Sequence, residues 1–185
     1  IIFPGMEYRG ETVDYYEQEI IDAVDRSESK ELVIIHSIDN VSTDDITEFP
    51  KIGLLATITL KLNIPNSKMR YIFIGLKRIE ISSYEEENGI YYANYKEIET
   101  NKDNKIEEDK YLTMLYRNYE KYVREISSVS NAMLDEISSI KNLDKLTDFI
   151  VSFLNLSPDI KKEYLYELNP VKRAMNLVSQ LKEEI

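Results

Sequence analysis

The spacing of apolar residues changes near residue 100, and this change limits the possible folds more than any other feature of the chain. From residue 31 to about residue 99 apolar and polar residues tend to alternate, as in residues 58–64, which is the period of a strand. Beyond residue 111 apolar residues recur at intervals of three and four, the period of an amphipathic helix. The sequence predicts an α+β chain, with a β-rich domain over 1–104 and a helical bundle over 105–185.

Turn residues divide the first half into short antiparallel strands. Pro65-Asn66-Ser67 and Asn88-Gly89 are typical hairpin turns, because asparagine and glycine tolerate positive φ. The predicted strands are residues 32–35, 58–64, 69–74, 79–81 and 91–99. One helix is expected before them, with Thr12 as N-cap and Val13, Tyr16, Ile20 and Val24 on its inner face.

The second half carries repeated helix start signals. The polar stretch 100–109 predicts a linker or the approach to a helix. A long helix should follow, with these residues inward: Leu112, Leu115, Tyr116, Tyr119, Val123 and Ile126. Asn142, Ser157-Pro158 and Asn169-Pro170 each predict the start of a further helix. In the last of these helices the expected inward residues are Val171, Ala174, Met175, Val178 and Leu181. About four or five helices are expected.

The charge balance excludes several classes of partner. The 185 residues include 23 Lys and Arg against 34 Asp and Glu, so the net charge is 23 − 34 = −11. Nucleic acids and anionic membranes need a cationic face, and neither is expected as a partner. No cysteine, signal peptide or membrane-spanning run is present, so we expect a cytoplasmic protein. The chain begins without Met, and we expect its true start to lie upstream.

No catalytic, cofactor-binding or metal-binding residues are predicted. His36 is the only histidine, and none of the five glycines precedes a lysine as a P-loop requires. The cluster Glu85-Glu86-Glu87 precedes Asn88-Gly89 and is expected in an exposed loop. Near Ser42-Thr43, the acids Asp44, Asp45 and Glu48 lack calcium-loop spacing and indicate a capped helical turn. His36 is expected to have a structural role or to lie on the surface.

Five blocks in order resemble the N-terminal domain of the Lon ATP-dependent proteases. They are Phe3-Pro4-Gly5-Met6, residues 52–58, residues 62–66, residues 71–78 and residues 143–150, and 156–168 resembles the next helix of that family. The chain departs from the family pattern at residues 7–14, at Ile74 in place of a glutamate, and at Ser67 in place of a turn glycine. The resemblance covers nearly the whole chain.

The resemblance implies a PUA-like antiparallel pseudo-barrel followed by helices that lead to an ATPase. ATP, Mg and a Ser-Lys catalytic dyad would belong to parts of such a protease outside this chain. The expected function is then recognition of unfolded, damaged or degron-bearing proteins, with other subunits of a Lon ring as further partners. Exposed tyrosines suit such contacts, and the chain has 14. Met6, Tyr8, Tyr91 and Tyr92 are the candidate substrate contacts.

Three alternatives remain open from sequence. A stand-alone adaptor with the same domain would be favoured by a reading frame that ends near Ile185. RNA binding would suit a PUA-like fold, but the net negative charge of the chain argues against it. A hydrolase using the acidic loop would lose activity on Glu85→Ala or Glu87→Ala.

Overall fold

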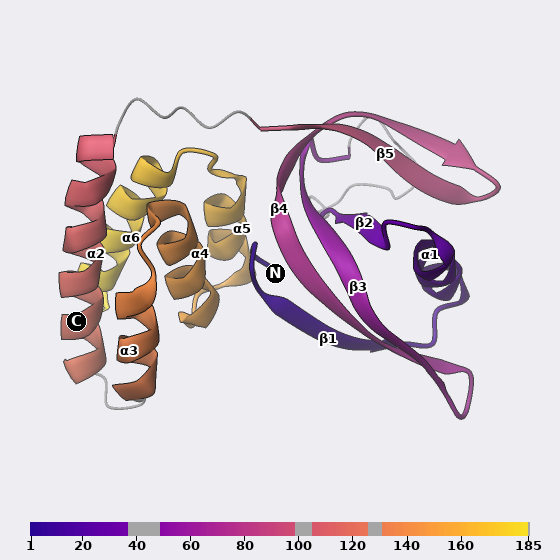
Figure 1. Ribbon diagram of the computed structural model, residues 1–185, viewed down its shortest axis with the longest axis horizontal. Coiled ribbons are helices and arrows are strands. Elements are labelled where there is room, and N and C mark those ends of the chain that lie inside the picture. The colour runs from indigo at the N-terminus through magenta and orange to yellow at the C-terminus, as the bar shows by residue number, and fades with distance from the viewer. Residues whose placement is uncertain (37–48, 99–104, 126–130, 185) are drawn as a thin grey trace. The chain divides into compact units, whose positions relative to one another are not determined.

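The chain forms two compact units, Ile1–Ile98 and Glu99–Ile185. Their architecture comes from a computed structural model, which describes residues 1–36, 49–98, 105–125 and 131–184 (Figure 1). The predicted turn at 42–48 and residues 100–104 of the predicted linker lie outside the described residues.

The first unit is a curled antiparallel sheet with one helix against it (Figure 1). Four strands lie in the order β1-β4-β3-β2, and β5 pairs with β4. The elements are β1 (Glu7–Thr12), α1 (Tyr15–Arg26), β2 (Glu31–Ile34), β3 (Ile52–Ile64), β4 (Lys68–Glu87) and β5 (Ile90–Glu97). The expected α+β class with antiparallel pairing is confirmed.

Both predicted hairpin turns are present. Asn66 and Ser67 connect β3 to β4 with φ of 71° and 59°, and Asn88 and Gly89 connect β4 to β5 with φ of 53° and 81°. Two successive residues with positive φ give a backbone twist that matches paired strands. Between the turns, β4 runs unbroken for 20 residues, so the prediction of separate strands at 69–74 and 79–81 was wrong.

Two further local predictions were wrong. Glu85–Glu87 are exposed but form the end of β4, paired with β5, and not a loop. Thr12 ends β1 and is buried, whereas the N-cap of α1 is Asp14, whose side chain accepts a hydrogen bond from the Glu17 amide at 2.9 Å. Val13 precedes the helix and is exposed. β1 was not expected, because its residues are mostly polar.

The two faces of the sheet carry separate apolar clusters. On one face Ile21 of α1 packs with Ile58, Met69 and Phe73, and Leu32 and Ile34 of β2 lie against them. On the other face the buried residues are Leu55, Ile79 and Ile81; partly buried residues packed against them are Val33, Ile35, Tyr84 and Ala93. Successive residues of β2 therefore point alternately to the α1 side and to the β5 side.

The second unit contains five helices within its described residues. They are α2 (Lys105–Glu125), α3 (Asn131–Ser139), α4 (Leu143–Phe153), α5 (Pro158–Tyr166) and α6 (Pro170–Glu183). The predicted caps are confirmed: Asn142, Ser157 and Asn169 each accept a hydrogen bond from the first turn of the helix that follows. Residues 105–109 belong to α2, so this part of the polar stretch starts the long helix.

The inner face of α6 differs from the predicted one. Leu177 is buried, whereas Met175 is exposed. Arg173 is also buried, with Nη1 3.3 Å from Oδ1 of the buried Asp148, and Nη2 bonded to Asp144. The core of the second unit therefore contains an ion pair that apolar spacing does not predict.

Candidate functional site

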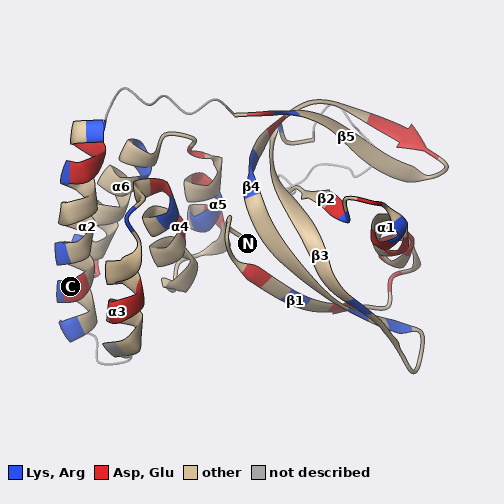
Figure 2. Cartoon of the chain, viewed as in Figure 1, with Lys and Arg blue, Asp and Glu red and all other residues tan. Residues whose placement is uncertain are grey.

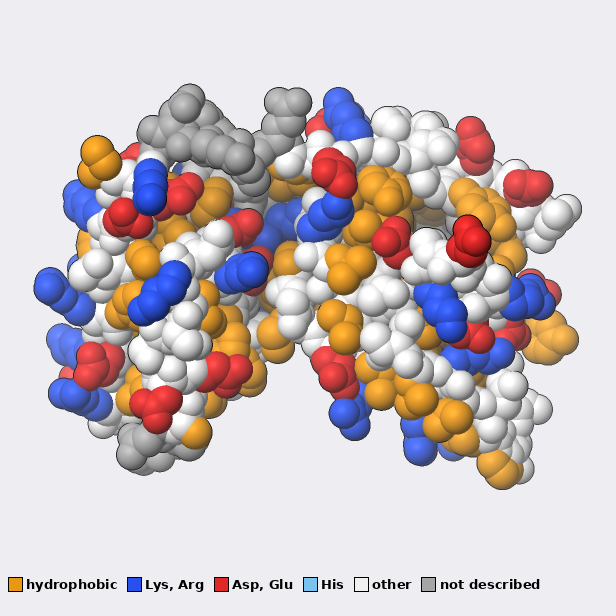
Figure 3. Space-filling view, in the orientation of Figure 1, with side chains coloured by type: hydrophobic (Ala, Val, Ile, Leu, Met, Phe, Trp, Pro, Cys, Tyr) orange, Lys and Arg blue, Asp and Glu red, His pale blue; other side chains and the backbone are white. Residues whose placement is uncertain are grey.

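An open groove of about 1120 Å³ lies in the first unit, and residues of α1, β2, the β4–β5 hairpin and Leu55 of β3 line it. α1 supplies one wall, the β4–β5 hairpin the opposite wall, and the whole of β2 the floor between them. On this face hydrophobic side chains gather between β5 and α1 (Figure 3). We call this hollow the β2 groove.

The α1 wall is mainly apolar, with residues at helical spacing. Tyr16, Ile20, Ala23 and Val24 line the groove, and all come to one side of the helix because they are separated by three or four residues. The Asp14 cap fixes where this helix begins. The sequence predicted Tyr16, Ile20 and Val24 as an inner face, and Tyr16 and Ile20 instead line an open hollow.

The opposite wall is mainly aromatic. Tyr91, Tyr92 and Tyr95 of β5 line the groove together with Phe49 and Tyr84. Phe49 holds this wall together, because its ring meets those of Tyr84 and Tyr91 edge-on at centroid distances of 5.1 and 5.7 Å. The Tyr84 hydroxyl donates to the Pro50 carbonyl at 2.5 Å. Tyr92 is 47% exposed, so part of this wall is accessible to a ligand.

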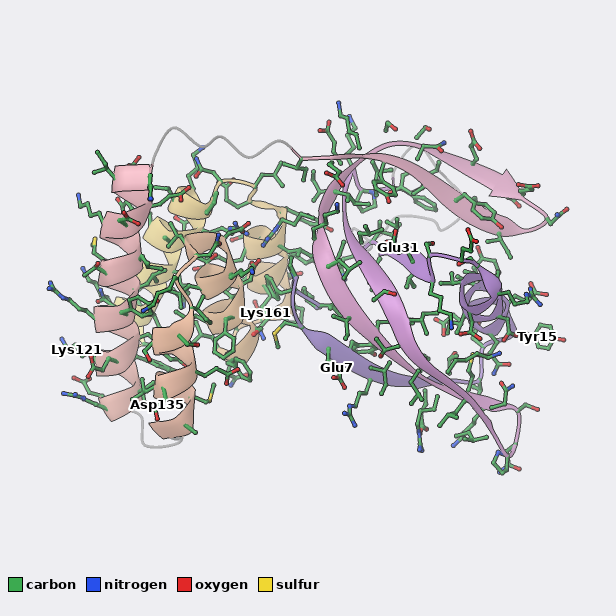
Figure 4. All side chains as sticks on the ribbon, in the orientation of Figure 1. Glu7, Tyr15, Glu31, Lys121, Asp135 and Lys161 are labelled. Atoms are coloured by element: carbon green, nitrogen blue, oxygen red, sulfur yellow. The ribbon has the colours of Figure 1, made fainter. Side chains whose placement is uncertain are left out.

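The charged residues that line the groove are all acidic. They are Glu17 on α1 and Glu31 at the start of β2, and no lysine or arginine is among the described lining residues. Figure 4 labels Glu31 on β2, and Figure 2 shows further acidic residues on α1 and at the end of β4. The groove is thus apolar with an acidic rim.

The groove brings together two of the four predicted contact residues. Tyr91 and Tyr92 line it, whereas Met6 and Tyr8 do not. The Met6 carbonyl accepts a hydrogen bond of 2.9 Å from the amide of Gly75, a residue of β4. Tyr8 lies on β1, partly exposed, with its ring 6.1 Å from that of Tyr71. Burial, with a smaller contribution from Tyr8, raises the pKa of Tyr71 to about 12.

Sequence reasoning missed Tyr16, Tyr95 and Ile90 as lining residues. Tyr95 could have been found, because it lies in the same predicted strand as Tyr91 and Tyr92 and is also partly exposed. No local pattern in the sequence indicated that β5 and α1 would line the same groove on either side of β2. Ile90 follows the Asn88-Gly89 turn directly.

The groove offers binding surface and little chemistry. Across residues 1–36, 49–98, 105–125 and 131–184 no cluster of three or more His, Asp or Glu could hold a metal ion. His36 is half-buried just beyond β2, and Glu85 and Glu87 lie exposed on the hairpin.

None of the helices in the described ranges is long and apolar enough to cross a membrane.

A second, smaller hollow lies in the helical unit. It measures about 360 Å³ and is lined mostly by polar and acidic residues of α5, its C-cap and α6, among them Glu163, Glu167 and Glu183. The smaller volume and the polar lining make it a weaker candidate for binding polypeptide than the β2 groove.

Comparison with known families supplies the decisive observation. The family described as the ATP-dependent protease La (LON) substrate-binding domain matches residues 1–183 of this chain. The chain belongs to this family.

Related proteins are similar over most of this Lon substrate-binding domain. Lon protease from Bacillus thuringiensis is 26% identical over 148 residues, which cover 80% of this chain and 18% of that protein. Lon protease from Fusobacterium nucleatum is 28% identical over 136 residues, or 73% of this chain and 18% of that protein. The chain spans about a fifth of the length of these relatives.

Solved structures have the same fold. The N-terminal domain of Mycobacterium avium complex Lon protease has a TM-score of 0.76 and 20% identity, covering 100% of this chain and 94% of that one. A Lon N-terminal domain protein from Xanthomonas campestris has a TM-score of 0.63 and 14% identity, covering 97% and 92%.

Proposed function

We propose that this domain captures unfolded or degron-bearing segments of protein substrates for a Lon-type ATP-dependent serine protease. Membership of the substrate-binding family supports the capture of protein substrates. The accessible tyrosine wall supports the β2 groove as the place where they bind. Unfolded chains expose apolar side chains that folded proteins bury, and an accessible apolar surface binds them without chemistry.

The partners follow from charge and from the family. A net charge of −11 and the acidic rim of the groove favour clients with basic residues near an apolar run. In the parent protease other subunits of a ring would carry further copies of this domain. Several weak sites in one ring bind a long chain more tightly, because the second contact forms at high effective concentration.

Binding should depend on the groove tyrosines. Tyr92 and Tyr95 are partly exposed lining residues, so Tyr92→Ser and Tyr95→Ser remove ring contacts while leaving the sheet hydrogen bonds in place. Aromatic contacts at an interface centre commonly contribute more than 1 kcal/mol, so each change should weaken binding about fivefold or more.

The test compares unfolded and folded forms of one protein. The 185-residue chain is titrated with reduced, carbamidomethylated ribonuclease A and with native ribonuclease A, a basic protein whose charge this treatment leaves unchanged, and binding is measured by fluorescence anisotropy. Tyr15→Ser is the matched control, because Tyr15 is 80% exposed on α1 and does not line the groove. Tyr8→Ser and Met6→Ser test the two predicted contacts outside the groove. Equal binding of the two forms would contradict the proposal.

A further inference from the structure

Within the described residues β2 pairs with a strand along one edge, and the β2 groove runs along its other edge. One side of β2 pairs with β3, and no other strand among the described residues pairs with it. Five consecutive residues, 31–35, line the groove. A hollow above one face of a strand would meet every second residue, so a run of five places the groove along the strand edge.

The phase of the β2–β3 hydrogen bonds shows which backbone groups face the groove. The Ile58 amide donates to the Lys30 carbonyl at 3.0 Å, and the register then places Leu32 opposite Ala56 as a bonded pair. Val33 lies opposite Leu55 as a non-bonded pair, so its N–H and C=O point away from β3. These two groups are the donor and acceptor that an added strand requires.

A strand added at this edge would contact both walls. Leu32 and Ile34 face the side covered by α1, and Val33 and Ile35 face the side covered by the β4–β5 hairpin. A neighbouring strand has the same alternation, so its side chains would reach Ile20 and Val24 on one side and the aromatic wall on the other. Both walls are apolar, so the groove fits a continuous apolar run and not an alternating one.

We propose that the β2 groove binds its substrate by strand addition, as an extended apolar segment flanked by Lys or Arg that hydrogen-bonds to Val33. The inference rests on the proposed function and names its binding mode. Continuous apolar runs are typical of strands buried in folded proteins, which are exposed only after unfolding. Glu17 and Glu31 would meet the basic flanks.

The first test changes the ligand alone. The probe is a labelled peptide with five consecutive apolar residues between lysine pairs, and its partner has the same side chains with every amide of the run N-methylated. N-methylation removes the donors but leaves the apolar surface, so the methylated peptide should bind the 185-residue chain at least about tenfold more weakly. Equal affinity would overturn strand addition while leaving the proposed function intact.

The second test changes β2. Val33→Pro removes the outward N–H and places the ring in the path of an added strand, whereas the bonds of Leu32 and Ile34 to β3 remain. Val33→Thr keeps the N–H and the β-branched shape and is the control. We expect binding of the unmethylated peptide to fall at least about tenfold in the proline variant only.

The outcomes separate the two proposals. If both Val33 variants bind equally while Tyr92→Ser binds weakly, side chains alone hold the substrate and strand addition is wrong. If neither the peptide nor unfolded ribonuclease A binds the unaltered chain, the proposed function fails and strand addition fails with it. Should Val33→Pro lose its circular dichroism signal, the peptide comparison on the unaltered chain decides.

Discussion

Replacing Arg173 by methionine should strongly destabilise the helical unit. Arg173 is 1% exposed and Asp148 is 3% exposed, and Nη1 lies 3.3 Å from Oδ1. Methionine fills much of the space of the aliphatic stem but leaves the Asp148 carboxylate buried without this cation. Breaking a buried ion pair by removing one partner typically costs about 3–5 kcal/mol, a large share of the stability of a small domain.

The assay is urea unfolding followed by far-UV circular dichroism, whose helical signal comes mostly from the second unit, because it holds five of the six helices described. With a slope of about 2 kcal/mol per M of urea, the midpoint should fall by about 1.5–2.5 M. The double variant Arg173→Met with Asp148→Leu should recover most of this loss, because both buried charges are then absent.

Asp144 provides the internal comparison. It also bonds to Arg173 but is 44% exposed, so water can replace the contact, and Asp144→Asn should cost only about 0–1 kcal/mol. If Arg173→Met shifts the midpoint no more than Asp144→Asn does, the buried pair with Asp148 is not a major source of stability and the reasoning is refuted.

Three smaller effects follow from local geometry. Ser157→Ala removes the α5 cap and should cost about 1 kcal/mol in the same urea assay. Gly75→Ala places a methyl group 2.6 Å from the Phe3 carbonyl oxygen, so thermal unfolding should show a loss of about 1–3 kcal/mol. The hydrogen bond from Arg70 lowers the pKa of Glu11 below its usual 4.5, so this contact stabilises the fold above that pH and is lost as pH falls through the lowered pKa. Carboxyl NMR titration should find the pKa of Glu11 back near its ordinary value in Arg70→Gln, and an unchanged pKa would contradict the assignment.

Local sequence signals predicted turns and caps well. The Asn88-Gly89 turn and the Asn142, Ser157 and Asn169 caps depend on residues next to one another, and all are present. Features set by distant contacts were missed. The mostly polar residues of β1 form a strand because β4 pairs with them, and Arg173 is buried because α4 supplies acids to it.

The residues of the candidate site also divide into those with a local sequence signal and those without one. Tyr91 and Tyr92, which line the groove, were predicted as contacts because adjacent tyrosines on a strand point to opposite faces and cannot both be buried on one face. Tyr16 was taken for core, since helical spacing marks an apolar face but not what covers it. The groove itself depends on α1, β2 and β5 meeting across about 80 residues of sequence, and no local pattern contains that information.

Hydrogen exchange of the 185-residue chain, with and without reduced, carbamidomethylated ribonuclease A, tests the central claim most directly. We predict slower exchange at the Val33 amide and along β5 when the unfolded protein is added, and no change with native ribonuclease A. Protection confined to the α5–α6 hollow, or none at all with either form, would contradict the assignment of substrate binding to the β2 groove.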